Sequence, residues 1–331
     1  MNTVLHECLK EAETIAVLGH VKPDGDCVGS CLALCRYIRN NYPEKRVRVW
    51  LQESQDRFSY LKGFREICHY PDSRLKPDLA VALDVSDKGR LGEFTFLFDR
   101  ARHTLNIDHH VTNPGFAEMT VCEPEASSAC EVLYELIRPE LIDRDTAACL
   151  YCGLMTDTGA FAYNSNRAEL FHIVAMLLAK GIDKDKIYRN VYYSYTESRL
   201  RLMGYLMNEK LEYFPEQHAA LFALTEQEMK QFNYIRGDAE GFVNLPLQIK
   251  GTRLSISLRE DTEKPIVRVS LRSIGDFPCN QMAERYFNGG GHRNAAGGWL
   301  PKPISLAIIN ARKAIMAEPL FANTTTIENQ Q

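Results

Sequence analysis

Four short apolar runs in the first half of the chain each lead into a cluster of acidic residues. In the clearest of them, polar and apolar side chains alternate over residues 103–107, and Asp108, His109 and His110 follow directly. The other three runs lead into segments 19–26, 84–87 and 156–159. Open α/β folds bind their ligands at the carboxyl edge of the sheet. Four acid-rich segments in this position are therefore expected to meet at one edge and form one site.

The order of the apolar runs predicts the fold class. Strands alternate with helical segments, which favours a mostly parallel sheet with helices on both faces, because parallel strands need crossover connections. The expected strands are 14–18, 46–51, 79–83, 104–107 and 119–122, and the expected helices are 1–14, 29–38, 125–137, 145–155 and 167–180. Residues 23–26 are expected to form a turn by composition.

The pattern changes after residue 219, which predicts a second, smaller α/β domain with a mixed sheet. Its expected elements are strands 219–224, 253–259 and 265–272, with a hairpin between the last two, and a helix at 280–287. The predicted organisation is a catalytic domain at 1–185, a helical connector at 186–212, a substrate-binding domain at 213–318 and a polar, frayed end from residue 318 with a tail at 319–331. An active-site cleft is expected between the two domains.

Composition restricts the partners of the chain. Lys plus Arg number 39 and Asp plus Glu 43, a net charge of −4, which argues against a broad basic surface for long duplex nucleic acid. No apolar run is long enough for a membrane span, and the N-terminal segment is acidic rather than signal-like, so we expect a cytoplasmic protein. Apolar helices would allow a homodimer, but no contacting face stands out.

The ten cysteines are expected to be structural. Cys27, Cys31 and Cys35 lie four residues apart, which is the spacing of one buried helix face. Cys149 and Cys152 lie in an apolar helical run without a second pair at zinc-finger spacing.

Carboxylates and imidazoles without converging thiolates form a ligand set that suits Mn²⁺, Mg²⁺ or Fe²⁺. So many carboxylates together would repel one another strongly unless cations filled the site. A single His–Asp pair is more often a core hydrogen bond than a ligand pair, but the combination favours a metal site. By contrast, Asp87, Asp99 and Asp143 lack such a setting and are expected in turns or caps.

The motifs together resemble the DHH phosphoesterase superfamily, which includes RecJ-type exonucleases, family II pyrophosphatases and nano-RNase/pAp phosphatases. The resemblance covers nearly the whole chain. It rests on His20-x-x-x-Asp24-x-Asp26, on Asp84, on Asp108-His109-His110, on Asp157-Thr158-Gly159 and on the glycine-rich signature at 289–297.

The resemblance implies two divalent metal ions, expected to be Mn²⁺. It implies that one ion is held by His20, Asp24 and Asp84, and the other by Asp26, Asp84, His109 and Asp157, with Asp84 as the bridge. Asp108 would orient a histidine, which leaves His110 free to face the substrate. Our hypothesis is that either His110 or a water protonates the leaving oxygen. The resemblance also implies a DHH-associated C-terminal domain that holds the nucleotide. Its matching residues here are Arg272, Ser273, Gly289, Gly290, Gly291 and His292.

The function predicted from these features is that of a phosphoesterase in which metal-activated hydroxide cleaves short oligoribonucleotides to 5′-mononucleotides and cleaves pAp to AMP. Both reactions break a bond between phosphorus and a ribose 3′-oxygen. The alternatives are a phosphodiesterase of linear or cyclic dinucleotide messengers and a non-catalytic nucleotide sensor. A family II pyrophosphatase is disfavoured because that family lacks the Gly-Gly-Gly-His signature.

Overall fold

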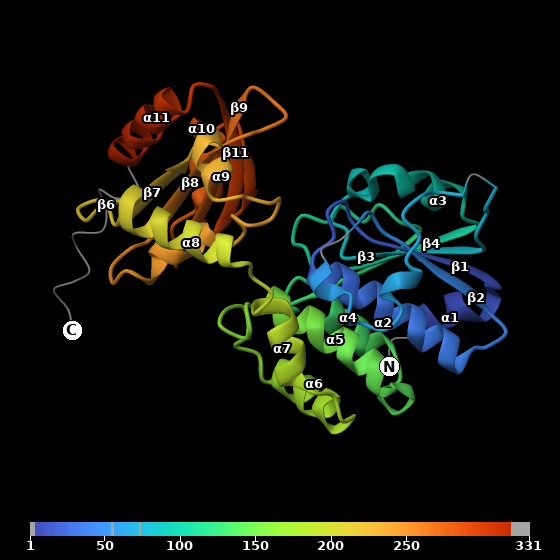
Figure 1. Cartoon of the computed structure of the whole chain (residues 1–331). Coiled ribbons are helices and arrows are strands. Elements are labelled where there is room, and N and C mark those ends of the chain that lie inside the picture. Colours follow the sequence, from blue (N-terminus) through green and yellow to red (C-terminus); the bar gives the residue numbers. More distant parts are fainter. Residues whose placement is uncertain (1–3, 54–55, 73, 319–331) are drawn as a thin grey trace. The chain divides into compact units, whose positions relative to one another are not determined.

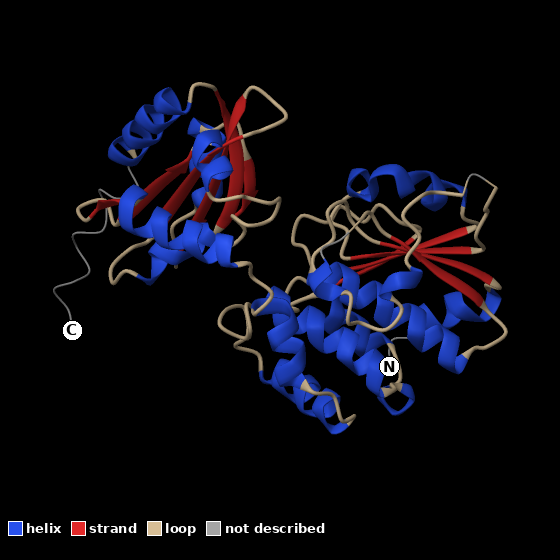
Figure 2. Ribbon diagram, in the orientation of Figure 1, coloured by secondary structure: helices blue, strands red, loops and turns tan. Residues whose placement is uncertain are grey.

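The computed structural model describes residues 4–53, 56–72 and 74–318, so the predicted tail at 319–331 lies outside the described residues. The chain divides into two compact units, Met1–Ser194 and Tyr195–Gln331 (Figure 1). Each unit is built around its own β-sheet (Figure 2).

The first unit contains a five-stranded parallel sheet in the order β2-β1-β3-β4-β5. Its strands are β1 (Thr14–Leu18), β2 (Arg46–Trp50), β3 (Leu79–Leu83), β4 (His103–Asp108) and β5 (Met119–Cys122). All five predicted strands are present within a residue of their expected bounds. The carboxyl ends of parallel strands share one edge, so the residues that follow β1, β3 and β4 come together there.

Helices cover both faces of this sheet, as predicted. Ile15 and Val17 point to one buried core, whereas Ala16 and Leu18 point to another, because side chains alternate along a strand. The larger core lies under α1 (Val4–Glu11), α2 (Gly25–Asn41), α4 (Ala129–Leu136) and α5 (Arg144–Asp157). The smaller core lies under η3 (Lys88–Phe94) and α3 (Thr95–Arg100).

Helix α2 begins earlier than predicted. Residues 23–26 were expected to form a turn, but Gly25 and Asp26 belong to the first turn of α2. The Asp24 carboxylate accepts the backbone N–H groups of Asp26 (3.2 Å) and Cys27 (3.1 Å), so it is the N-cap. A Cβ at Gly25 would lie 2.4 Å from the Thr156 hydroxyl, which shows how closely α2 and α5 approach.

The first unit continues through two further helices, and the segment predicted as a connector is interrupted. The helices are α6 (Ala168–Ala179) and α7 (Lys184–Tyr192); α8 (Glu197–Tyr205) then runs into the π-helical η5 (Leu206–Lys210). Thr196 accepts the Arg199 N–H at 3.1 Å and caps α8, so residues 193–196 separate α7 from α8.

The second unit contains a six-stranded mixed sheet in the order β10-β11-β9-β8-β7-β6. Only β7 and β8 pair in parallel; the predicted β8–β9 hairpin is present. The strands are β6 (Glu212–Phe214), β7 (Ala219–Leu224), β8 (Leu254–Glu260), β9 (Ile266–Ser273), β10 (Gly290–His292) and β11 (Ala295–Pro301). Its helices are α9 (Glu226–Gln231), α10 (Cys279–Tyr286) and α11 (Ile304–Ala317).

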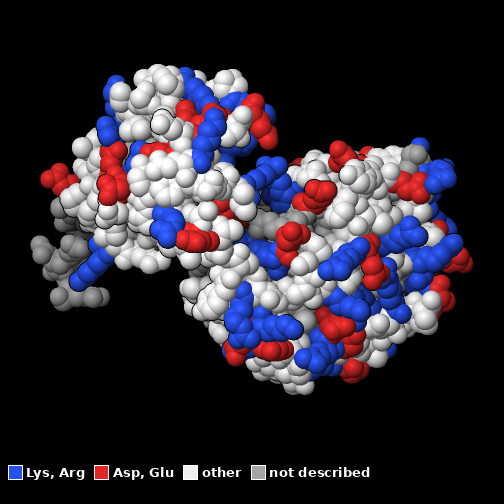
Figure 3. Space-filling model, viewed as in Figure 1, with Lys and Arg blue, Asp and Glu red and all other residues white. Residues whose placement is uncertain are grey.

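Short helical turns complete the described structure. They are η1 (Asp56–Phe58), η2 (Phe64–Glu66), η4 (Pro139–Leu141) and η6 (Phe242–Gln248). Among the described residues, no helix has both the length and the apolar character of a membrane span. Acidic and basic side chains are interspersed over each unit on the face drawn in Figure 3.

The prediction that the frayed end starts at residue 318 is wrong for Glu318. This side chain is buried and accepts hydrogen bonds of 3.1 and 3.2 Å from Arg285 Nη1. A buried carboxylate needs such a partner, because an unpaired charge is costly to bury. Glu318 therefore belongs to the folded second unit.

Candidate active site

The predicted acidic segments meet at the carboxyl edge of the first sheet. His20 follows β1, Asp84 directly follows β3, and Asp108 ends β4 and precedes His109. Asp157, the last residue of α5, reaches the same place from the helical layer. The fold thus brings all four predicted segments together.

Asp84 lies at the centre of this group. Its Oδ2 is 3.3 Å from His20 Nε2, and its Oδ1 is 3.6 Å from both His109 Nε2 and His110 Nδ1. The side chain is almost fully buried, and the backbone has a φ of 58°, in the left-handed region that few residues other than glycine adopt. The two oxygens of Asp84 therefore face two different sets of partners, as a bridging ligand requires.

Asp24 and Asp26 enter from the first turn of α2. Asp24 lies 3.7 Å from His20 Nε2 and remains partly exposed. Asp26 is buried, and its oxygens accept the N–H groups of Ala129 (2.6 Å) and Cys130 (3.0 Å) at the start of α4. The positive end of the α4 dipole therefore stabilises this carboxylate.

The donor atoms of the described residues form three overlapping groups. The groups are His20, Cys27 and Asp84; Asp84, His109 and His110; and Asp26, His109 and Asp157. Within each group the donor atoms lie within 4.8 Å of one another. Because Asp84 and His109 are each shared between two groups, they form one continuous centre.

A second layer of polar contacts orients the histidines. His20 Nδ1 lies 2.9 Å from the Val21 carbonyl oxygen, which directs Nε2 toward Asp84. His110 Nδ1 lies 2.7 Å from Asp108, so Asp108 contacts the second histidine of the motif. Such partners of imidazole rings fix their tautomer and orientation.

Two asparagines in this layer were not identified from the sequence. Asn113 Nδ2 donates to Asp108 at 2.5 Å and to Asn106 Oδ1 at 2.7 Å. Asn106 is fully buried in β4 and donates to the Ala82 carbonyl at 3.2 Å. A polar residue inside an apolar strand was the available signal for Asn106, whereas Asn113 lies in a loop without any pattern.

The protonation of the centre reflects its crowded charges. Burial raises the pKa of Asp26 to about 7, and the charge of Asp84 adds to this effect. Burial and the charge of Asp26 likewise raise the pKa of Asp157 well above its ordinary value. Burial opposes protonation of His109, but its hydrogen bond to Asp84 and the nearby carboxylates raise its pKa to about 10. Burial also opposes ionisation of Asp84, but His109 and His20 hold its pKa well below the usual range.

The crowding of carboxylate and imidazole donors in this centre fits divalent cations. Without a cation, burial and mutual repulsion oppose ionisation of Asp26 and Asp157, while the surrounding carboxylates favour protonation of His109. Divalent ions could replace those protons and let the carboxylates ionise together. Imidazole and carboxylate donors at this density are suited to such ions.

The predicted substrate residues lie together in the second unit. Arg272 pairs in register with Ala295 of β11, which also faces His292 of β10. Ser273 donates to the Phe277 carbonyl at 2.6 Å and accepts from Asn294 at 2.9 Å, so its hydroxyl supports the local loop.

The glycines beside these residues allow close backbone packing. A Cβ at Gly289 would lie 1.9 Å from the Gly297 carbonyl oxygen, and one at Gly291 would lie 2.6 Å from that of Ala295. Gly290 and Gly291 belong to β10.

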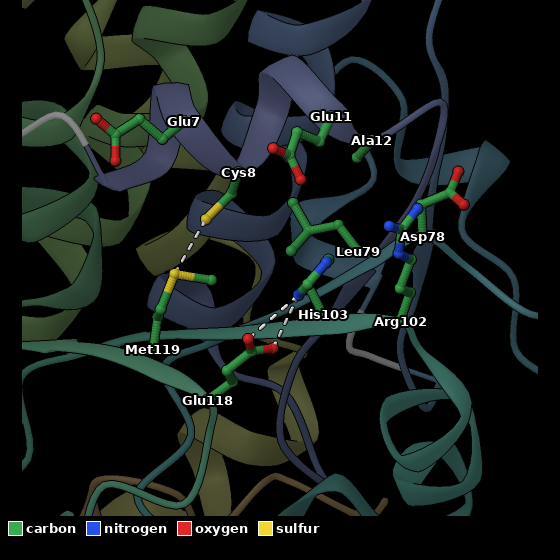
Figure 4. Close-up of a pocket in the computed structure, with 10 residues that line it drawn as sticks. All are labelled: Glu7, Cys8, Glu11, Ala12, Asp78, Leu79, Arg102, His103, Glu118 and Met119. Atoms are coloured by element: carbon green, nitrogen blue, oxygen red, sulfur yellow. Dashed lines mark hydrogen bonds and ion pairs between the residues drawn. The ribbon is translucent and has the colours of Figure 1, made fainter.

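A cavity of about 220 Å³ lies at the opposite edge of the first sheet, beside the starts of β3, β4 and β5 (Figure 4). Several of its polar groups are paired with one another or with the backbone. His103 Nδ1 lies 3.0 Å from Glu118, and Asp78 accepts hydrogen bonds from Thr14 and Glu13. We assign no part of the chemistry to this cavity.

Three comparisons relate this geometry to known proteins. Residues 14–154 match the DHH family, N-terminal domain, and residues 219–317 match the DHHA1 domain. A probable bifunctional oligoribonuclease and PAP phosphatase from Streptococcus mutans is 28% identical over 291 residues, covering 87% of this chain and 90% of the relative. The bifunctional oligoribonuclease and PAP phosphatase of Thermus thermophilus is 28% identical over 298 residues, covering 89% of this chain and 86% of the relative.

A solved structure extends the similarity over nearly the whole length. An exopolyphosphatase-related protein from Bacteroides fragilis superposes with a TM-score of 0.91 and is 38% identical, covering 96% of each chain. The resemblance predicted from the motifs is thereby confirmed. The chain belongs to the DHH family and carries a DHHA1 domain after its DHH domain.

Proposed function

We propose that this protein is a metal-dependent phosphoesterase that hydrolyses short oligoribonucleotides to 5′-mononucleotides and pAp to AMP. The observation that carries the proposal is the meeting of four acidic segments around Asp84, whose two oxygens face His20 and His109. Relatives named as oligoribonucleases and PAP phosphatases, similar over most of the chain, support the choice of substrate.

The proposed metal ligands are those that the motif predicts. His20, Asp24 and Asp84 would hold one ion, and Asp26, Asp84, His109 and Asp157 the other, with Mn²⁺ as the expected metal. When bound, two such ions supply an activated water as nucleophile and neutralise the phosphoryl oxygens. Asp26 would be held ready for this role by the N–H groups of Ala129 and Cys130.

His110 would protonate the departing ribose 3′-oxygen. Because Nδ1 contacts Asp108 at 2.7 Å, the proton would be delivered from Nε2. Asp108 would keep the ring in one orientation, and Asn113 would hold Asp108 in turn. A positioned acid of this kind contributes about 10²–10⁴-fold to a rate.

Substrate selection is assigned to the domain at 213–318. Arg272 of β9 and His292 of the glycine-rich β10 pair with the same residue, Ala295 of the intervening β11, and suit an anionic nucleotide. We also assign the protein to the cytoplasm. All ten cysteines are free, which is the usual state of thiols in a reducing compartment.

The test compares four substrates side by side: a 5′-phosphorylated adenosine dinucleotide, pAp, cyclic di-AMP and pyrophosphate. Each is assayed with Mn²⁺ and with chelator, for wild type, Asp84→Asn and the control Asp99→Asn. Asp99 is an exposed partner of Lys88 outside the centre.

Metal-dependent cleavage of the dinucleotide and pAp, lost only in Asp84→Asn, is the expected result. Cleavage of cyclic di-AMP alone would mean that the substrate is a dinucleotide messenger and not a short oligoribonucleotide. Binding without turnover of any compound would identify a sensor.

A further inference from the structure

Cys27 is a donor in the centre that the family motif does not include. It lies in the first turn of α2, three residues after the N-cap Asp24 and directly after Asp26. Its side chain is fully buried, and its sulfur, a His20 nitrogen and an Asp84 oxygen all lie within 4.8 Å of one another. The three side chains therefore provide sulfur, nitrogen and oxygen donors at one position.

The local backbone holds the thiol in this place. The Cys27 N–H donates to the Asp24 carboxylate at 3.1 Å, which fixes the helical turn. A Cβ at Gly19 would lie 2.3 Å from Cys27 Sγ, so the sulfur packs against the residue that precedes His20. A larger residue at position 19 would displace the sulfur from the centre.

All three cysteines on this helix face belong to the same apolar core, and they differ in whether they also lie among metal-type donors. Cys31 and Cys35 continue along α2 into the apolar core, and neither belongs to a donor group among the described residues. Core filling, the role expected for all three cysteines from their spacing, accounts for Cys31 and Cys35. It does not account for the position of Cys27 beside two predicted metal ligands.

We propose that Cys27 is a thiolate ligand of the ion held by His20 and Asp84. The inference rests on the proposed function, in that it requires the centre to bind divalent ions. On binding, a metal–sulfur bond forms and the thiol releases its proton to solvent. Thiolate is a softer ligand than carboxylate, so Cys27 would raise the affinity of this position for Co²⁺ and Zn²⁺ more than its affinity for Mn²⁺. The position formed by Asp26, His109 and Asp157 keeps the harder set that suits Mn²⁺.

The test is a titration of the metal-free full-length protein with Co²⁺, followed by absorption spectroscopy. Wild type is expected to show visible cobalt bands together with an intense near-ultraviolet sulfur-to-cobalt band. Cys27→Ser should keep the visible bands and lose the near-ultraviolet band. Cys31→Ser is the matched control, one turn further along the same buried face, and should keep both.

The outcomes separate this inference from the proposed function. If neither wild type nor either variant binds cobalt, the protein has no metal centre and both proposals are wrong. Visible bands without a sulfur band in wild type would overturn the role of Cys27 alone. A sulfur band that persists in Cys27→Ser would assign the bond to another thiol and also overturn it.

A measurement on wild type guards against a variant that fails to fold. Cadmium-113 bound to the native protein should give a resonance in the range of sites with one sulfur ligand, whereas a shift typical of nitrogen and oxygen ligands only would contradict the proposal. If Cys27→Ser folds, its affinity for Zn²⁺ should fall about tenfold or more, equivalent to about 1.4 kcal/mol, while its affinity for Mn²⁺ changes far less.

Discussion

The Asp26 carboxylate accepts a 2.6 Å hydrogen bond from the backbone N–H of Ala129, at the beginning of α4. The contact joins a predicted metal ligand on α2 to the first turn of another helix. Asp26→Asn should therefore lower kcat/KM for the dinucleotide by about 100-fold or more, because a neutral amide binds metal weakly and cannot accept both N–H groups. Steady-state kinetics in the presence of Mn²⁺ would measure the loss.

The control for Asp26 is Asp143→Asn. Asp143 also caps a helix, accepting the Thr146 N–H at 2.7 Å, and pairs with Arg36. This variant should change stability while activity stays near the wild-type value. Equal losses of activity in both variants would mean that Asp26 acts through helix capping alone.

His110→Gln should reduce kcat for the dinucleotide by about 10²–10⁴-fold, the range for loss of a general acid. A substrate with a p-nitrophenolate leaving group needs no proton at that oxygen. The loss should therefore be much smaller for bis-p-nitrophenyl phosphate. The same fractional loss for both substrates would contradict the role of His110 as the acid.

Removal of metal should destabilise the first unit. An ion that binds only the folded protein stabilises it by about 2.7 kcal/mol at a concentration of 100 times its Kd. Mn²⁺ should therefore raise the melting temperature of chelator-treated wild type, measured by thermal unfolding. Asp84→Asn should show little or no increase, and Asp99→Asn should respond as wild type does.

Asp78 gives a pH-dependent prediction away from the centre. Hydrogen bonds from Thr14 and Glu13 lower the pKa of Asp78, although burial opposes the shift. A lowered pKa contributes stability above the unfolded-state value of 3.8, and this contribution is lost as the pH falls through the folded-state value. Asp78→Asn should cost about 1 kcal/mol at neutral pH, since charge-assisted hydrogen bonds become neutral ones.

Urea unfolding at neutral pH and at decreasing pH would test this dependence. The difference in unfolding free energy between wild type and Asp78→Asn should be constant at neutral and mildly acidic pH. It should narrow below pH 3.8. A constant difference throughout would show that the charge of Asp78 is not responsible.

Gly291→Ala should impair the second unit selectively. Gly291 has a φ of 144°, and an added Cβ would lie 2.6 Å from the Ala295 carbonyl oxygen, so the β10–β11 pairing would be strained by about 1–3 kcal/mol. We expect KM for the dinucleotide to rise while Co²⁺ binding is unchanged. Gly204→Ala is the control, because a Cβ there meets no atom within 4 Å. An unchanged KM in Gly291→Ala would show that the β10–β11 hairpin does not take part in substrate binding.

The sequence predicted the first sheet well because its strands are short apolar runs with sharp polar ends. Thr14–Leu18 and Leu79–Leu83 were located to the residue for this reason. The start of α2 was misplaced because Pro-Asp-Gly-Asp has turn-like composition, whereas the Asp24 cap makes Gly25 and Asp26 helical. Caps and turns use the same residue types, so composition alone could not distinguish them.

The second unit was predicted less completely. Strands β10 and β11 are rich in glycine and alanine, so they lack the apolar alternation that identified β8 and β9. Among site residues, the DHH motifs indicated the acids and histidines, which the structure brings together. Asn113 and the position of Cys27 beside His20 depend on tertiary packing and left no local signal.

The close approach of α2 and α5 determines how far the carboxylates of the centre can move relative to one another. Gly25 faces Thr156, and a Cβ at Gly153 would lie 2.7 Å from an oxygen of Asp26. The distance between Asp26 and Asp157 is therefore set by two helix backbones that pack directly against each other. A single methyl group added where α2 and α5 touch would increase this distance. The geometry of the centre can therefore be altered by residues that carry no functional group at all.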